Sequence, residues 1–113
     1  MSTIMIVGAT RGIGLELTKQ YAGEGNKVIA CARDTKKASL LDEAASSSEN
    51  ISIQQLDIAD PSSIESASNH IGDHTIDSLI IVAGSVGGMP ENQSLDNLDI
   101  DEWHNTLNIN TIG

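Results

Sequence analysis

The chain has 113 residues, enough for one domain, and its core would be aliphatic because only 2% of its residues are aromatic. A net charge of -10 argues against a nucleic-acid surface, because a phosphate backbone requires clustered Lys and Arg. The sequence has no membrane-length apolar run, no secretion signal and a single cysteine, Cys31, so we expect no membrane association and a reducing, cytoplasmic setting.

Strand and helix patterns alternate along the chain. Apolar runs predict strands at residues 3–8, 27–32, 51–57 and 76–82. Apolar residues at helical spacing predict helices at 12–23 and 35–46, from Asp60-Pro61 to about Ile71, and from about Asp99 to the chain end. Residues 84–98 are rich in Gly, Asn, Ser and Asp and are interpreted as a loop.

Repeated β-α-β units with buried strands predict a parallel sheet with helices on both faces. We therefore expect an α/β fold, a Rossmann-like doubly wound sheet of four strands in the order 3-2-1-4, with residues 1–113 as a single domain. On the first helix, Ile13, Leu17, Tyr21 and Ala22 are expected near one face. Cys31 lies within an apolar strand and is expected to be buried.

The first strand ends in a glycine-rich turn. Its glycines, Gly8, Gly12 and Gly14, follow the pattern G-x-x-x-G-x-G, and a helix begins at once. Glycine permits a tight turn and lets backbone N–H groups approach an anion, and the helix start adds unpaired donors and a positive dipole end. The turn therefore indicates a nucleotide phosphate, although an ordinary strand–turn–helix connection is the alternative. The spacing matches neither G-x-G-x-x-G nor a P-loop.

Four motifs together resemble the short-chain dehydrogenase/reductase family, along the whole chain. The glycine turn is similar to that family's Thr-Gly-x-x-x-Gly-x-Gly, with Val7 in place of the threonine. The other three motifs are Leu56-Asp57-Ile58 with Asp60, Ile81-Val82-Ala83-Gly84 in place of Asn-Asn-Ala-Gly, and Asn110-Thr111-Ile112-Gly113 in place of Asn-x-x-Gly. The resemblance implies binding of a nicotinamide dinucleotide.

The resemblance also assigns roles to individual residues. It implies that the Asp57 side chain and the Ile58 N–H hold adenine, that Ala83 and Gly84 approach the ribose, and that Asn110, rather than Asn108, supports a catalytic lysine through a water. The full expected cofactor set is Gly8, Thr10, Arg11, Gly12, Ile13, Gly14, Arg33, Asp57, Ile58, Ala83 and Gly84. The three histidines lack metal-ligand spacing, so no metal site is expected.

Basic residues near the second strand favour NADP(H) over NAD(H). Four of the six Lys and Arg residues fall in the two loops that would flank a 2′-phosphate: Arg11, Arg33, Lys36 and Lys37. In the resembled family, an Arg at the place of Arg33 and a basic residue at the place of Arg11 mark NADP(H) preference, and a guanidinium matches phosphate oxygens. Alternatively, Arg33 pairs with Asp34 or a helix carboxylate. NAD(H) stays open, because Asp34 could face a ribose hydroxyl.

The resemblance implies NADP(H)-linked carbonyl–alcohol oxidoreduction. The family's catalytic Ser and Tyr-x-x-x-Lys lie beyond the equivalent of Gly113, and the one tyrosine here, Tyr21, has Gly25 four residues on. We therefore expect the N-terminal part of a longer reductase or a naturally short one, which binds cofactor without turnover. The alternatives are a non-catalytic dinucleotide-binding sensor or scaffold, and a methyltransferase-like glycine loop.

The end of the expected sheet suggests association. A fourth strand at the sheet edge would leave an apolar edge with unpaired backbone groups, and the last helix would expose Leu107 and Trp103. We therefore expect a homo-oligomer, or association through that edge and the last helix.

Overall fold

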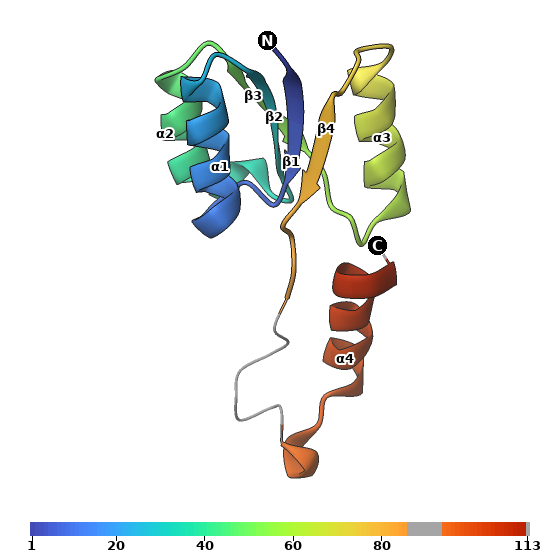
Figure 1. Ribbon diagram of the computed structural model, residues 1–113. Helices are drawn as coiled ribbons and strands as arrows, with labels where there is room; N and C mark the ends of the chain where they lie inside the picture. The colour runs from blue at the N-terminus through green and yellow to red at the C-terminus, as the bar shows by residue number, and fades with distance from the viewer. Residues whose placement is uncertain (86–93, 113) are drawn as a thin grey trace.

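A computed structural model describes residues 1–85 and 94–112, and it contains a four-stranded parallel sheet in the order β3-β2-β1-β4 (Figure 1). The strands are β1 (Thr3–Val7), β2 (Lys27–Ala32), β3 (Ile51–Gln55) and β4 (Ser78–Ile81). The helices are α1 (Gly12–Gly23), α2 (Ser39–Ser46), α3 (Pro61–Ile71) and α4 (Ile100–Leu107). The short helical segments are η1 (Thr35–Lys37), η3 (Leu95–Asn97) and η4 (Asn108–Ile112). The predicted fold class and strand order are confirmed.

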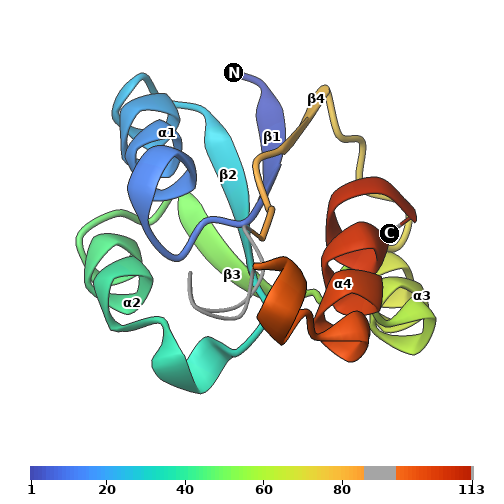
Figure 2. The same ribbon diagram turned by 90° about the horizontal axis from the view of Figure 1, so that it is seen from below.

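Helices cover both faces of the sheet. Seen from below in Figure 2, α1 and α2 lie on one side and α3 on the other. Ile6, Val28 and Leu41 are fully enclosed on the α1/α2 side, and Met5 and Ala67 belong to a smaller cluster on the α3 side. Successive residues of a strand face opposite sides of the sheet, and helices cover both sides of β1. Both sets of β1 side chains are therefore apolar, which makes its sequence a continuous apolar run.

The predicted helix over residues 35–46 is wrong at its start. Residues 35–37 form the separate turn η1, because the Asp34 carboxylate accepts from the Lys36 N–H at 3.0 Å and caps that turn. Ala38 then leaves helical geometry, with φ -102° and ψ 45°, and α2 begins one residue later. The Asp34 cap stabilises the start of η1, and the break at Ala38 separates that turn from α2.

The predicted apolar face of α1 is only partly correct. Ala22 is buried, but Ile13 is 73% exposed, and the buried middle of the helix is formed by Leu15 and Thr18. The Thr18 hydroxyl donates to the Gly14 carbonyl at 2.8 Å, so this buried polar group is satisfied within the helix. Cys31 is fully buried, as expected.

The last helical segment projects beyond the carboxyl ends of the strands (Figure 1). As a result the radius of gyration is 15.5 Å, against roughly 13 Å for a compact chain of this size. The loop predicted at 84–98 is described only in part, since residues 86–93 lie outside the described residues. Within residues 1–85 and 94–112, no helix combines the length and apolarity that a membrane crossing requires.

Candidate functional site

The glycine turn lies where β1 ends and α1 begins, at the carboxyl edge of the sheet. Gly8 has φ +93°, and a Cβ there would stand 2.8 Å from the Ala83 nitrogen, so this position needs glycine for both conformation and space. Gly14 lies inside α1, and a Cβ on it would overlap the Gly8 carbonyl oxygen. These two glycines therefore let the helix start approach β1 and the segment after β4.

Gly12 differs from the other two glycines. Its φ is +59°, yet a Cβ there would meet no atom of the described residues within 4 Å. Gly12 and its neighbours Arg11 and Ile13 are exposed, and Thr10 is half-buried. The turn therefore presents its middle to solvent, where a ligand could approach the backbone closely.

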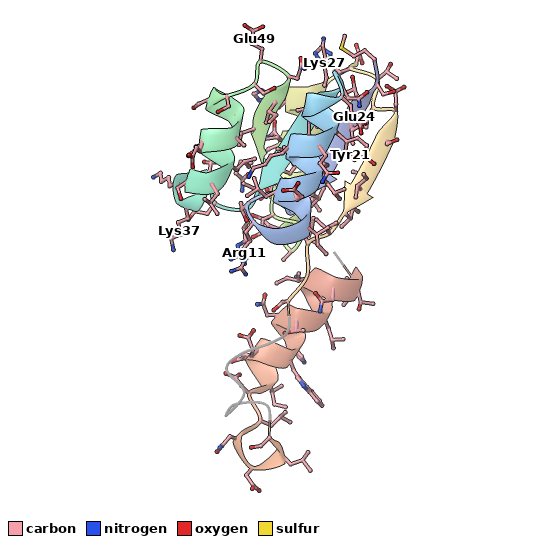
Figure 3. All side chains as sticks on the ribbon, turned by 60° about the vertical axis from the view of Figure 1, so that its left-hand side comes forward. Arg11, Tyr21, Glu24, Lys27, Lys37 and Glu49 are labelled. Carbon is pink, nitrogen blue, oxygen red and sulfur yellow. The ribbon has the colours of Figure 1, made fainter. Side chains whose placement is uncertain are left out.

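The first turn of α1 is suited to an anion. The N-cap residue Arg11 makes no side-chain cap, and the first turn carries no acidic residue. The first N–H groups of a helix lack intrahelical partners, and the helix dipole places partial positive charge there. Arg11 and Lys37 project at the same end of the α1/α2 layer, while Glu24 and Glu49 lie at the other end (Figure 3).

Arg33 lies one residue beyond β2, and its side chain is exposed. Within the described residues its guanidinium pairs with no carboxylate. Asp34 instead caps η1, so the surface pair that the sequence left as an alternative is not seen. In the described part of the chain, Arg33 therefore presents an unpaired positive charge at the edge where the glycine turn opens.

Asp57 and Ile58 follow β3 at the same edge, and both are half-buried. The Asp57 Oδ1 atom accepts from the Ala59 N–H at 3.0 Å, and the Asp57 N–H donates to the Ser63 hydroxyl at 2.9 Å. Both bonds hold the turn between β3 and α3 in a fixed shape. Within the described residues Asp57 Oδ2 has no hydrogen bond, so it remains available to a donor.

Ala83 and Gly84 follow β4, and Asn110 reaches them from η4, a single stretch of π-helix. The Ser85 N–H donates to Asn110 Oδ1 at 2.7 Å, and Asn110 Nδ2 donates to the Ser85 carbonyl at 2.6 Å. Both ends of the amide are thus used on one backbone residue. A π-helical stretch is uncommon and is frequent at functional sites. Gly113, the end of the Asn-x-x-Gly motif, lies outside the described residues.

Sequence reasoning missed several contacts that hold this edge together. Asn108 Nδ2 donates to the Ala59 carbonyl at 3.2 Å and so joins η4 to the turn after β3. Gln55 and Ser63 link the turn after β3 to the residue after β2. Polar residues beside a motif could have drawn attention to them, but their partners are far away in sequence and only the fold brings them together.

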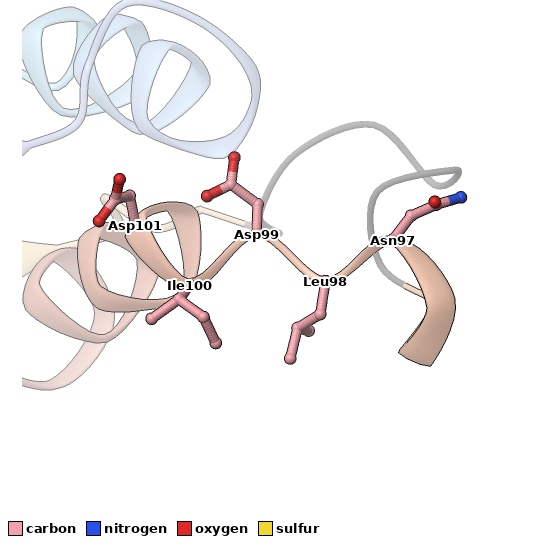
Figure 4. Close-up of a pocket in the computed structure, with 5 residues that line it drawn as sticks. All are labelled: Asn97, Leu98, Asp99, Ile100 and Asp101. Carbon is pink, nitrogen blue, oxygen red and sulfur yellow. The ribbon is translucent and has the colours of Figure 1, made fainter.

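A concave region at the start of α4 is a poor candidate for binding an anionic cofactor. An open pocket of about 510 Å³ lies at the start of α4 and is lined by Asn97, Leu98, Asp99, Ile100 and Asp101 (Figure 4). Its two carboxylates would repel an anionic cofactor, and Asp99 already caps α4 by accepting from the Glu102 N–H at 3.1 Å. In the part of the chain that the structure describes, no three His, Cys, Asp or Glu side chains gather as metal ligands.

Fold and edge together define a doubly wound α/β protein of Rossmann type. The profile described as short chain dehydrogenase matches residues 2–113. The chain therefore belongs to the short-chain dehydrogenase/reductase family, which confirms the resemblance drawn from its motifs.

Named relatives extend this comparison. NADPH-dependent pterin aldehyde reductase of Arabidopsis thaliana is 29% identical over 98% of this chain and 46% of its own length. NADPH-bound carbonyl reductase from chicken fatty liver has a TM-score of 0.84 and 28% identity, over 99% of this chain and 44% of its own. A Pseudomonas aeruginosa PAO1 carbonyl reductase in complex with NADP has a TM-score of 0.84 and 30% identity, over 99% and 50%. The chain spans about half the length of these relatives.

Proposed function

We propose that this chain is the NADP(H)-binding part of a short-chain dehydrogenase/reductase that acts on a carbonyl or alcohol substrate. The observation that carries the proposal is a glycine turn free of carboxylates at the same sheet edge as Arg33, whose guanidinium pairs with no carboxylate among residues 1–85 and 94–112. Relatives named as NADPH- or NADP-bound reductases support the same cofactor.

Each part of the edge receives a part of the cofactor in this proposal. The turn of Gly8, Thr10, Gly12, Ile13 and Gly14 holds the pyrophosphate at the start of α1. Arg33 and Arg11 together hold the 2′-phosphate, because a guanidinium offers paired donors to phosphate oxygens.

The remaining contacts lie on the β3 and β4 side. Asp57 receives the adenine amino group on Oδ2, and the Ile58 N–H donates to the ring. Ala83 and Gly84 lie against the nicotinamide ribose. The ribose can approach closely because Ala83 has only a methyl side chain and Gly84 has none. Asn110 acts as a positioning residue for the catalytic lysine of the full-length family pattern.

When bound, NADPH supplies a hydride for a carbonyl carbon. The chain's own residues bind and orient the cofactor, and no Tyr-x-x-x-Lys stands in residues 1–113 to transfer the proton. We therefore expect the 113-residue chain to bind cofactor without reducing ketones. A non-catalytic dinucleotide-binding sensor or scaffold remains the second candidate function, because the glycine turn and Arg33 would serve it equally well.

Calorimetric titration with NADP⁺ and NAD⁺ tests the proposal. Arg33→Ala should weaken NADP⁺ binding by about 10- to 150-fold, because a lost charge-assisted hydrogen bond costs about 1.5–3 kcal/mol. Lys27→Ala is the matched control, since Lys27 is exposed at the opposite end of β2 (Figure 3) and should leave both affinities unchanged. Equal affinity of the wild type for the two cofactors would contradict the Arg33 assignment.

We further propose that the chain forms one domain and works in a reducing cytoplasm. We also propose that it associates with other copies of itself through β4 and α4. Leu79 and Ile81 on one face of β4 are 58% and 59% exposed, and Trp103 and Leu107 on α4 are 57% and 53% exposed. Exposed apolar side chains beside an unpaired strand edge favour association. Light scattering at low micromolar concentration should give a mass above 11.9 kDa, and a stable monomer would count against the proposal.

A further inference from the structure

The backbone ladder between β2 and β3 stops just short of Arg33. Its last pair is Ala32 with Gln55, and the Leu56 N–H then donates to the Ala32 carbonyl at 3.0 Å. Beyond that point the Gln55 side chain continues the ladder, because its Nε2 donates to the Arg33 carbonyl at 3.0 Å. A side-chain amide thus fixes the peptide group of Arg33.

The other end of the Gln55 amide is also occupied. The Ser63 hydroxyl, buried in the first turn of α3, donates to Gln55 Oε1 at 3.0 Å and accepts from the Asp57 N–H at 2.9 Å. One continuous relay therefore runs from the Arg33 carbonyl through Gln55 and Ser63 to the Asp57 backbone.

We propose that Gln55 and Ser63 are positioning residues that set the preference for a 2′-phosphorylated cofactor. This inference rests on the proposed function, in which Arg33 holds the 2′-phosphate and Asp57 holds adenine. The relay fixes the spacing between these two contacts. Gln55 acts on Arg33 through its backbone, and Ser63 joins that constraint to the adenine turn.

The relay matters for selectivity because the Arg33 side chain has no partner within the described residues. Binding of the phosphate orders both the Arg33 side chain and its backbone. A backbone that is already fixed removes the backbone part of this entropic cost. Removing the Gln55 bond should therefore weaken the phosphate contact while leaving the turn of α1 untouched. Binding of NAD⁺, which lacks the 2′-phosphate, should change little.

Gln55→Met tests this directly, since it removes both amide bonds and keeps the length of an exposed side chain. We expect NADP⁺ affinity to fall by about 2- to 12-fold, the range for one hydrogen bond, with NAD⁺ affinity unchanged. Gln54→Met is the matched control, because its Nε2 bonds only the neighbouring Gln55 carbonyl. A residue with a merely structural role would lower both affinities equally or neither.

A double-mutant cycle separates the two proposals. In the Arg33→Ala background, Gln55→Met should have no further effect on NADP⁺ affinity, because the group that it positions is already gone. An equal loss in both backgrounds, or an unchanged NADP⁺/NAD⁺ ratio in Gln55→Met, would overturn the relay while leaving the proposed function intact. A wild-type chain that binds neither cofactor would overturn the proposed function, and the relay with it.

Discussion

The three glycines of α1 make different demands on the fold, and substitution by alanine should separate them. At Gly14 a Cβ would overlap the Gly8 carbonyl oxygen and lie 2.8 Å from Val82 Cγ2. The carbonyl belongs to the backbone after β1 and cannot rotate away, so α1 must move from two neighbours at once. Overpacking of this kind costs about 3 kcal/mol at the upper end of its usual range.

Gly12 and Gly23 provide the matched controls on the same helix. A Cβ on either meets no atom within 4 Å in the part of the chain that the structure describes, so neither substitution creates a clash there. Gly12→Ala should cost about 1–2 kcal/mol, because its φ of +59° lies in the left-handed region. Gly23→Ala should gain about 0.5–1 kcal/mol, because it restricts the unfolded chain at a compatible position.

Urea unfolding followed by circular dichroism measures these differences. With a slope of about 1–1.5 kcal/mol per molar urea, Gly14→Ala should lower the midpoint by about 2–3 M, and Gly23→Ala should raise it by about 0.5 M. A Gly14→Ala midpoint within about 0.5 M of the wild type would show that α1 does not approach Gly8 as closely as the structure has it. Failure of Gly14→Ala to fold, with Gly12→Ala and Gly23→Ala folded, would agree with the reasoning.

Two further predictions follow from shifted pKa values. Burial raises the pKa of the Cys31 thiol from its ordinary value of 9.0 to about 12. The contribution of the neutral thiol to the free energy of unfolding is therefore fully present below pH 9.0 and is lost as the pH rises toward 12. A thiol reagent should therefore label Cys31 only as fast as the protein unfolds, and rapid labelling of the native state would contradict its burial. The Ser62 hydroxyl, with the Ser62 and Ser63 N–H groups, lowers the pKa of Asp60 below 3.8, so its stabilisation is present above that pH and lost as the pH falls through the lowered value. Urea midpoints of Asp60→Ala should therefore fall below the wild type at neutral pH and converge with it in acid, and a pH-independent difference would refute the charge argument.

The fold was predictable because its signals are local. β1 is apolar and buried from Ile4 to Val7, as a central parallel strand requires, and Asp60-Pro61 begins α3 where an acidic cap and a proline predict. The errors arose at the starts of two helices. Ala38 leaves helical geometry and separates η1 from α2, and Ile13 in the first turn of α1 is exposed while Gly14 and Leu15 beside it are buried.

The sequence by itself determined the family, the strand order and the positions of the glycine turn, because glycine spacing and strand patterns are readable along one chain. Only the tertiary structure decided how the loops at the sheet edge are held. Among the described residues it left Arg33 without a carboxylate partner, joined it to Asp57 through Gln55 and Ser63, and placed the Asn110 amide on Ser85. Those partners lie up to 25 residues apart, so no local pattern records them. Parallel strands bring their carboxyl ends to one edge, and that edge is where the contacts form.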